Sequence, residues 1–495
     1  MKKQLILILS VGTIIILSFL LFSSAFYPLF NSDDGVTVLM LHYFKLPRDL
    51  YFWNQDRYGS VVPLLGQVFY KGLGISSLWS ESLTHYIILV LGYLSFSSLL
   101  KSLSTKIAFA IVWFFPIVYF HHGLLRNAFG LEYSFIGMGI YLMNCYQKSI
   151  DAPLGMRTAV LALLFLIFTT AVWVADPAII TVFIIISISA YFIFRRDKSL
   201  KNLLLSFESW FLLVGGLLGI LLIFYFKSIA GKFVITTYGF QINSIRESFS
   251  ALHIVKEVLF DVFAFKIPDT MVSAYAYLVL ILIVLAVFFR PGKNDFPDND
   301  RKWMWVFVLD GLVLFLIVLM SHWALLNGVA RRYFTGLYIV FWLAYLIYFD
   351  LSQKTMLKKI ACWLILATVV LGAIGTVYSF KYVYPKRLTP KAEIVREFEQ
   401  LGKIGLISEY WNSYGTSFVN PDLIKATPHD RSDVRNYDLV DSVFNQPRIY
   451  IIKDMWMDSF LDTLNQFDHT LLRKGDGFRI GGCWVCEYEK IMGKQ

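Results

Sequence analysis

The chain has 495 residues, of which 57% are hydrophobic and 16% charged, and its mean hydropathy is +0.60. Soluble globular domains carry about 25% charged residues, so this composition excludes a soluble protein and indicates one that faces lipid. The net charge of +10 does not indicate nucleic-acid binding, because most Lys and Arg residues lie in short links between apolar runs. Four cysteines do not make a disulfide framework.

The first apolar run, 4–26, follows two lysines and therefore has some features of a signal peptide. Its end, Ser23-Ser24-Ala25, has the small residues of a cleavage site. The run is longer than a usual signal core, and further apolar runs follow it. We therefore interpret it as a retained first helix; cleavage would leave the topology of the rest unchanged.

Apolar runs long enough to cross roughly 30 Å of hydrocarbon predict an α-helical polytopic membrane protein with about eleven spans. The runs lie at 4–26, 83–100, 106–120, 128–146, 157–174, 177–194, 203–226, 271–289, 303–322, 333–349 and 358–380. Every second link is basic: examples are Lys101, Lys106, Lys148, Arg157, Arg195, Arg196, Arg290, Lys302, Lys354 and Lys358. Basic links stay on the cytoplasmic side, so we predict a cytoplasmic N-terminus and an extracytoplasmic C-terminus.

Three outer segments are long, and we expect them to carry the soluble parts of the protein. The segments 27–82 and 227–270 contain helical patterns, at 36–44, 61–70 and 248–265, which suit helices at the membrane surface. Hydropathy falls after residue 383, so we expect a transmembrane domain over 1–383 and a small α/β domain over 384–495. In that domain we predict helices at 390–401 and 457–467 and strands at 404–408, 423–426, 448–452, 469–473 and 478–488.

The segment 27–82 opens with two adjacent carboxylates, Asp33 and Asp34, directly after the first span. A carboxylate whose pKa is tuned by its neighbour and by partial burial can act as a general base. The same residues suit the capping of a helix that begins near Val36. Further along, Asp56 and Arg57 lie in a polar, aromatic stretch that either binds a sugar or forms an ordinary loop with an internal ion pair.

Arg331 and Arg332, followed by Tyr333, lie in a link that the topology places outside. Outer links are normally poor in Lys and Arg, so two adjacent arginines at this position indicate a specific role. Arginines bind phosphate through paired, charge-assisted hydrogen bonds, which suits the phosphate of a lipid-linked substrate. The alternative is two side chains that simply reach the membrane surface.

Other polar groups near the membrane are candidate contacts for a substrate, because such groups usually face a cavity. They are His122, Arg126 and Glu132 after the third span, and Asp176 in a short outer turn, where it either serves as a second acid or caps the turn. No set of residues has the spacing of a metal site; a divalent cation is compatible with the acidic residues. Cys483 and Cys486 predict either a close disulfide or two free thiols.

These motifs resemble the GT-C class of integral-membrane glycosyltransferases, in particular the protein mannosyltransferase and aminoarabinose transferase relatives. The resemblance is carried by Ser32-Asp33-Asp34, Asp56-Arg57, Asp176-Pro177 and Arg332-Tyr333, together with a long first outer loop and an extracytoplasmic C-terminal domain. The resemblance implies that Asp33, or its neighbour Asp34, is the catalytic base. It also implies that Arg332, helped by Arg331, contacts the phosphate of the donor.

The resemblance further implies an inverting hexosyltransferase of the bacterial inner membrane. Its donor would be a polyprenyl-phosphate-linked sugar, its acceptor a glycan, lipid or protein, and its surroundings membrane lipids. Two other functions fit the same composition: a flippase or transporter of lipid-linked oligosaccharides, and an envelope polysaccharide polymerase or ligase. A transporter would show repeated halves and charged or broken helices at mid-membrane, whereas here the polar candidates gather at one face.

Overall fold

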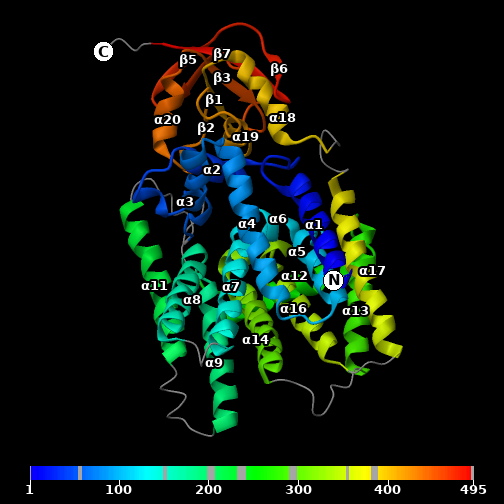
Figure 1. The fold of residues 1–495 in the computed structure, drawn as a ribbon. Helices are drawn as coiled ribbons and strands as arrows, with labels where there is room; N and C mark the ends of the chain where they lie inside the picture. The colour runs from blue at the N-terminus through cyan, green and yellow to red at the C-terminus, as the bar shows by residue number, and fades with distance from the viewer. Residues whose placement is uncertain are drawn as a thin grey trace. The chain divides into compact units, whose positions relative to one another are not determined.

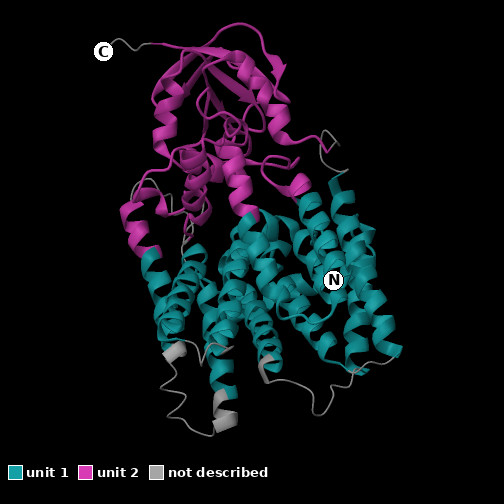
Figure 2. Cartoon of the chain, viewed as in Figure 1, with its two compact units in different colours: residues 1–18, 87–222, 238–386 teal, residues 19–86, 223–237, 387–495 magenta. Residues whose placement is uncertain are grey.

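The computed structural model describes residues 2–53, 58–148, 153–197, 207–230, 241–288, 298–352, 356–380 and 388–491. The chain forms two compact units (Figure 2), and each is described by itself. Unit 1 comprises Met1–Ser18, Ile87–Leu222 and Tyr238–Lys386; unit 2 comprises Phe19–Tyr86, Ile223–Thr237 and Arg387–Gln495. Segments that are far apart in the sequence therefore share one unit in both cases.

A helix lies over each of the apolar runs that the sequence predicts to cross the membrane (Figure 1). These helices are α1 (Lys2–Phe22), α4 (Ser77–Ser97), α5 (Leu103–Phe114), α7 (Ala128–Lys148), α8 (Leu154–Val174), α9 (Ala178–Asp197), α11 (Phe207–Ala230), α13 (Thr270–Phe288), α14 (Asp298–Met320), α16 (Thr335–Leu351) and α17 (Met356–Ser379). Among the described residues, 7 helices are long and apolar enough to cross a membrane. The chain is therefore an α-helical multi-pass membrane protein.

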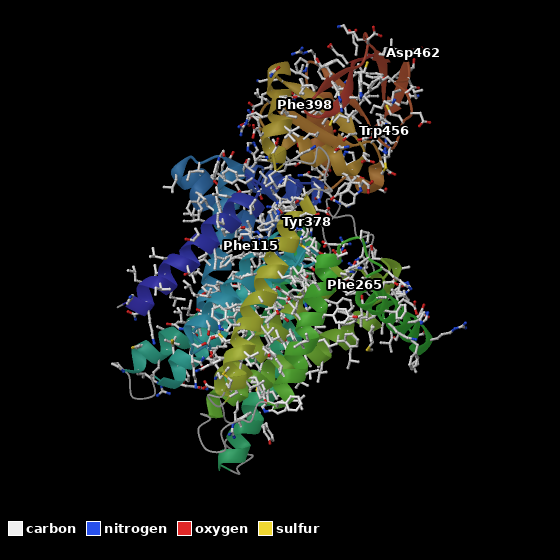
Figure 3. All side chains as sticks on the ribbon, turned by 90° about the vertical axis from the view of Figure 1, so that its right-hand side faces the viewer. Phe115, Phe265, Tyr378, Phe398, Trp456 and Asp462 are labelled. Atoms are coloured by element: carbon white, nitrogen blue, oxygen red, sulfur yellow. The ribbon has the colours of Figure 1, made fainter. Side chains whose placement is uncertain are left out.

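Between these long helices, unit 1 contains shorter ones. They are α6 (His121–Leu125), α12 (Ile245–Phe263), α15 (His322–Leu326) and the 3-10 helix η4 (Arg331–Phe334). The helix α12 begins at a capping box made by Ser244 and Glu247. It exposes Phe249 and Phe260, and Phe265 beyond its end is exposed as well (Figure 3). The amphipathic helix predicted at 248–265 is thus present.

The first segment of unit 2 contains two short helices. They are α2 (Ser32–His42) and α3 (Val61–Gln67), with the 3-10 turn η1 (Arg48–Leu50) between them and the π-helical turn η2 (Val68–Gly72) after them. The side chain of Asn31 accepts hydrogen bonds from the backbone N–H groups of Asp33 and Asp34, which fixes the start of α2. This helix begins four residues before the predicted range 36–44.

The C-terminal segment of unit 2 is a mixed sheet with helices. Its strands are β1 (Ile404–Ser408), β2 (Ile424–Pro428), β3 (Ile449–Lys453), β4 (Thr463–Gln466), β5 (His469–Arg473), β6 (Phe478–Ile480) and β7 (Cys483–Lys490). The order is β2-β1-β3-β7-β5-β4, and β6 pairs with β7. The first three strands are parallel and the rest antiparallel. The predicted α/β class of this domain is confirmed.

Helices connect the parallel strands, as a parallel sheet requires. The connection from β1 to β2 contains α19 (Tyr410–Ser417), and the connection from β2 to β3 contains η7 (Arg431–Asp433) and α20 (Tyr437–Phe444). Two further helices, α18 (Lys391–Val395) and η6 (Arg396–Leu401), precede β1. The side chains of Ile407, Val443 and Ile451 are buried in the core of this domain. Phe398, which is fully buried, and Trp456, which is partly buried, are labelled in Figure 3.

The helix predicted at 457–467 is wrong. Its apolar residues recur at helical spacing, but Thr463–Gln466 is the strand β4, paired with β5. The two strands are joined by Phe467 and Asp468, whose φ angles of 48° and 67° are those of a tight hairpin turn. Pairing across this turn satisfies the backbone of 463–466 in the sheet instead of in a helix.

The start of the first loop and the C-terminal helices share one hydrophobic core. Val36, Leu39 and Met40 from α2 pack with Tyr410 and Tyr414 from α19, and the same cluster contains Trp53 and Leu439. Figure 1 shows α2 beside α19. A loop near the N-terminus thus folds together with a domain that lies almost 400 residues later in the chain.

Candidate active site

Asp33 and Asp34 lie in the first turn of α2 but have different surroundings. Asp34 is 4% exposed, and its Oδ2 accepts the backbone N–H of Asn31 at 3.3 Å, which completes a capping box. Asp33 is only partly buried. Its Oδ1 accepts a hydrogen bond from the hydroxyl of Tyr410 at 2.5 Å. The cap occupies Asp34, and the carboxylate of Asp33 faces the C-terminal domain.

The backbone of α2 contacts α19 closely at two further points. The hydroxyl of Ser32 donates to the carbonyl of Tyr410 and accepts the N–H of Gly415 at 3.1 Å. A Cβ added at Gly35 would lie 2.4 Å from the carbonyl oxygen of Tyr414. Only glycine permits this approach, so the position of Asp33 relative to Tyr410 is set by backbone contacts.

Charged and polar groups join the same two segments beyond the end of α2. Asp438 at the start of α20 accepts from Arg48 at 2.9 Å and from Lys45 at 3.2 Å. Burial raises the pKa of the Asp438 carboxyl, but the bonds from Arg48 and Lys45 outweigh it, so the pKa is lowered overall. Tyr43 donates to the carbonyl of Pro421 at 2.7 Å. The first part of the loop, from Ser32 to Arg48, is therefore attached to the domain at several points.

In unit 1, Arg331 and Arg332 lie in η4, immediately before α16. The guanidinium of Arg331 lies 3.9 Å from the ring centroid of Tyr119, and that of Arg332 lies 5.4 Å from the centroid of Tyr333. Among the described residues, neither arginine forms an ion pair with a carboxylate. Two cations held on aromatic rings without a carboxylate are suited to bind an anionic ligand.

The turn that precedes this arginine pair has an unusual backbone. Gly328 and Val329 have φ angles of 63° and 50°. A positive φ is strained for a β-branched residue, and Val329 is nevertheless 4% exposed and packed in a local core. Strained residues of this kind tend to occur at functional sites, and this one lies two residues from Arg331.

The short helix α6 packs against η4 and carries another candidate residue. A Cβ added at Gly123 in α6 would lie 2.2 Å from Oγ1 of Thr335, which shows how closely α6 approaches the start of α16. His122 is in the first turn of α6, and its Nε2 is buried without a partner in the described part of the chain. Arg126 caps the end of this helix. The structure thus brings His122 and the arginine turn into one region of unit 1.

The acidic candidates of unit 1 form a separate group. Glu132 in α7 is 2% exposed and lies close enough to Asp176 and Asp310 for their charges to interact. Asp310 in α14 accepts hydrogen bonds from Thr181 at 2.8 Å and from Tyr133 at 3.1 Å. Nothing in one sequence shows which faces of α7 and α14 meet, so the proximity of Asp310 to Glu132 could not be predicted from the sequence.

Some predicted residues fall outside these groups. Asp56 and Arg57 lie outside the described residues. Cys483 and Cys486 are free thiols, so of the two alternatives for this pair the free thiols are correct. No group of three or more His, Cys, Asp or Glu residues within the described ranges could hold a metal ion.

Solved structures provide a comparison for the whole chain. ArnT from Cupriavidus metallidurans in the apo state is 11% identical, with 98% of each chain covered and a TM-score of 0.46. Its complex with undecaprenyl phosphate gives 11% identity, 97% coverage of each chain and a TM-score of 0.43. The apo oligosaccharyltransferase of Archaeoglobus fulgidus gives 11% identity and a TM-score of 0.45, with 90% of this chain and 69% of that chain covered.

These structures belong to the GT-C class of membrane glycosyltransferases, which is the class that the sequence motifs resemble. No model of a protein family matches the chain, and no curated protein matches it. All three TM-scores lie below 0.5. The function is therefore inferred from the residues of this chain.

Proposed function

We propose that the chain is a glycosyltransferase that moves a sugar from a polyprenyl-phosphate donor to an acceptor hydroxyl at the outer membrane face. Asp33 is the general base, and Arg331 and Arg332 bind the phosphate of the donor. The acceptor is a hydroxyl of a glycan, lipid or protein. The C-terminal domain, 384–495, and the first outer loop together receive the acceptor.

The reaction is an inverting displacement at the anomeric carbon of the sugar. The acceptor oxygen attacks this carbon as Asp33 removes its proton, and a new C–O bond forms. The bond between the sugar and the phosphate oxygen breaks, and its electron pair leaves with the lipid phosphate. Arg331 and Arg332 stabilise the negative charge that develops on that phosphate. The proton on Asp33 then passes to water, which restores the base.

The observation that carries this proposal is the difference between the two adjacent carboxylates. A base must reach the substrate, and Asp34 is buried in a helix cap, whereas Asp33 is partly exposed and held by one phenol. Asp33 is therefore the carboxylate of the pair that suits proton transfer.

The test is sugar transfer from polyprenyl-phosphate donors, measured with the purified protein in detergent or in membranes. Asp33→Asn keeps the shape of the side chain and removes the base, and we expect kcat to fall by about 10²–10⁴-fold. Arg332→Gln removes one phosphate ligand, and we expect a fall of about 10²-fold. Both variants should unfold at the same temperature as the wild type.

Two matched variants serve as controls. Asp468→Asn changes an exposed carboxylate of the same unit, and Arg246→Gln changes an exposed arginine on α12. Both should keep wild-type activity. Full activity in Asp33→Asn would rule out Asp33 as the base. Movement of the lipid-linked sugar across the membrane without transfer to any acceptor would favour the flippase alternative.

A further inference from the structure

The carboxylate proposed as the base is bonded to a tyrosine that is itself held by a buried arginine. The hydroxyl of Tyr410 donates to Oδ1 of Asp33 at 2.5 Å. The guanidinium of Arg435 lies 4.7 Å from the centroid of the Tyr410 ring. Arg435 is 8% exposed. The phenol thus donates to Asp33 while its ring lies against a guanidinium.

The hydroxyl of Tyr410 is not needed to attach α19 to α2. The ring of Tyr410 packs in the shared core with Val36 and Leu39. The backbone of α19 is held separately by Ser32 and by its close approach to Gly35. Removal of the hydroxyl alone would leave these contacts in place. Its specific effect is therefore on the carboxylate that it faces.

The charges around Tyr410 keep its hydroxyl protonated. Burial raises the pKa of Tyr410, the charge of Asp33 raises it further, and Arg435 opposes both; the pKa ends well above its ordinary value. The other titratable groups around this chain of bonds are Asp34 on α2, together with Tyr414 and Asp433, which both interact with Arg435. The helix α3, which also packs on α2, has no titratable residue.

We infer that Tyr410 and Arg435 are positioning residues that set the direction and the basicity of the Asp33 carboxylate. This inference rests on the proposed role of Asp33 as the base. A donor to a carboxylate stabilises its charged form and so keeps it ready to accept a proton. The same bond limits the rotation of the carboxylate. The C-terminal domain thus takes part in the reaction through these two residues.

The test compares pH profiles of kcat/KM for sugar transfer. Tyr410→Phe keeps the ring and removes the donor, so the ionised carboxylate that faces it loses a stabilising hydrogen bond. We expect the acidic limb of the profile to move upward by roughly one pH unit. On the plateau we expect kcat to fall by about tenfold, because the carboxylate is less well oriented. Arg435→Lys, which keeps the charge without the planar group, should move the limb in the same direction by less.

The matched control is Tyr450→Phe. Tyr450 on β3 donates to the carboxylate of Glu487 at 3.1 Å, so this variant removes the same kind of bond elsewhere in the same domain. Its pH profile should equal that of the wild type. An unchanged acidic limb in both Tyr410→Phe and Arg435→Lys would overturn the inference, and so would equal shifts in Tyr410→Phe and Tyr450→Phe. Either result could occur even if Asp33→Asn is inactive. The experiment can therefore overturn the role of Tyr410 and Arg435 without overturning the role of Asp33 as the base.

If Tyr410→Phe does not fold, its unfolding temperature will show this, and Arg435→Lys then decides the question by itself. The ring and the positive charge both remain in that variant. An upward shift of its acidic limb supports the inference. An unchanged limb overturns it.

Discussion

The first turn of α2 places two neighbouring residues of the same type in different surroundings. The Asp34 carboxylate accepts the N–H of Asn31, and Asn31 in turn accepts two N–H groups of the helix. This cap fixes the start of the helix. Because Asp33 directly precedes Asp34 in the same turn, the cap also fixes the position of Asp33, whose carboxylate faces Tyr410. In the proposed mechanism, Asp34 therefore holds the start of the helix and Asp33 acts on the acceptor.

Substitutions at Asp34 should therefore affect stability more than chemistry. Loss of a capping interaction costs about 1 kcal/mol, so Asp34→Ala should lower the unfolding temperature by a few degrees. At a temperature where it is folded, it should retain most of its activity. Asp34→Asn keeps an acceptor for the Asn31 N–H and should be close to wild type in both assays. A loss of kcat in Asp34→Asn as large as that in Asp33→Asn would contradict this assignment.

His42, near the end of α2, makes the stability of unit 2 depend on pH. Its Nε2 lies 3.3 Å from Oδ1 of Asp422, and its Nδ1 lies 2.9 Å from the hydroxyl of Tyr70. Burial lowers the pKa of His42; Asp422 opposes this shift and Lys425 adds to it. The folded chain therefore binds this proton less readily than the unfolded chain, whose His42 titrates near 6.5.

The sign of the pH dependence follows from this difference. Above about pH 6.5 the stabilising contribution of neutral His42 is fully present. As the pH falls from there toward the lower pKa of the folded state, the unfolded chain takes up more protons and stability is lost. We expect His42→Gln to reduce the slope of unfolding temperature against pH in this range. His253→Gln, which changes an exposed residue on α12, should leave the slope unchanged; an equal change in both variants would contradict the role of His42.

At the scale of elements, the contact of α2 with α19 depends on one glycine. A Cβ at Gly35 would lie 2.4 Å and 2.8 Å from the backbone oxygen and carbon of Tyr414. The helix would have to move away, and overpacking of this kind costs about 1–3 kcal/mol. We expect Gly35→Ala to lower the unfolding temperature and, because Tyr410 then no longer reaches Asp33, to lower kcat as well. Gly12→Ala, where nothing lies within 4 Å, should do neither.

A buried carboxylate connects three helices of unit 1. Asp310 on α14 accepts from Thr181 on α9 and from Tyr133 on α7. Asp310→Ala removes both acceptors, and a buried donor left without a partner costs about 1–3 kcal/mol. We expect this variant to unfold at a clearly lower temperature in detergent. Asp310→Asn keeps one carbonyl acceptor, so its unfolding temperature should lie between those of the wild type and Asp310→Ala. Equal stability of wild type and Asp310→Ala would show that these bonds do not hold the helices together.

The sequence predicts the long helices well because each coincides with an apolar run, and the length of the run is enough to identify it as a helix. It predicts β1, β2 and β3 to within one or two residues, since short apolar runs in a polar domain suit buried strands. It does not show α19 or α20, which are 8 residues each. Helices this short depend on tertiary packing. In α20 the apolar residues do follow helical spacing, at Leu439, Val440, Val443 and Phe444, but over only about two turns.

The candidate site is visible in the sequence only in part. Asp33 and the arginine pair stand out by their position beside apolar runs. Tyr410 is 377 residues from Asp33, and no local pattern relates two residues so far apart. Arg435 reads as one more charged residue of a soluble domain, because its burial beneath Tyr410 is a property of the fold. The two residues that contact the proposed base, Tyr410 and Arg435, could therefore be identified only from the structure.

At the scale of the whole molecule, the distribution of basic residues predicts how the chain is oriented in the membrane. Lys101 and Lys106 flank one predicted inner link, and Lys358 and Lys359 follow another. If these links are cytoplasmic, the N-terminus is cytoplasmic and both Arg331-Arg332 and the C-terminal domain are outside. Asp33, in the first outer loop, is then on the same side as the arginines. This orientation is a requirement of the proposed reaction.

The orientation can be tested with single cysteines in a variant that lacks the four native ones. We expect an impermeant maleimide to label two of these variants in cells whose outer envelope layers have been permeabilised. They are Asp468→Cys, in the exposed turn of the C-terminal domain, and Leu326→Cys, exposed at the end of α15. Lys3→Cys, at the exposed start of α1, should react only after the membrane that contains the protein is permeabilised. Labelling of Leu326→Cys only after permeabilisation would place the arginines on the cytoplasmic side, where they could not act with Asp33 on a donor at the outer face.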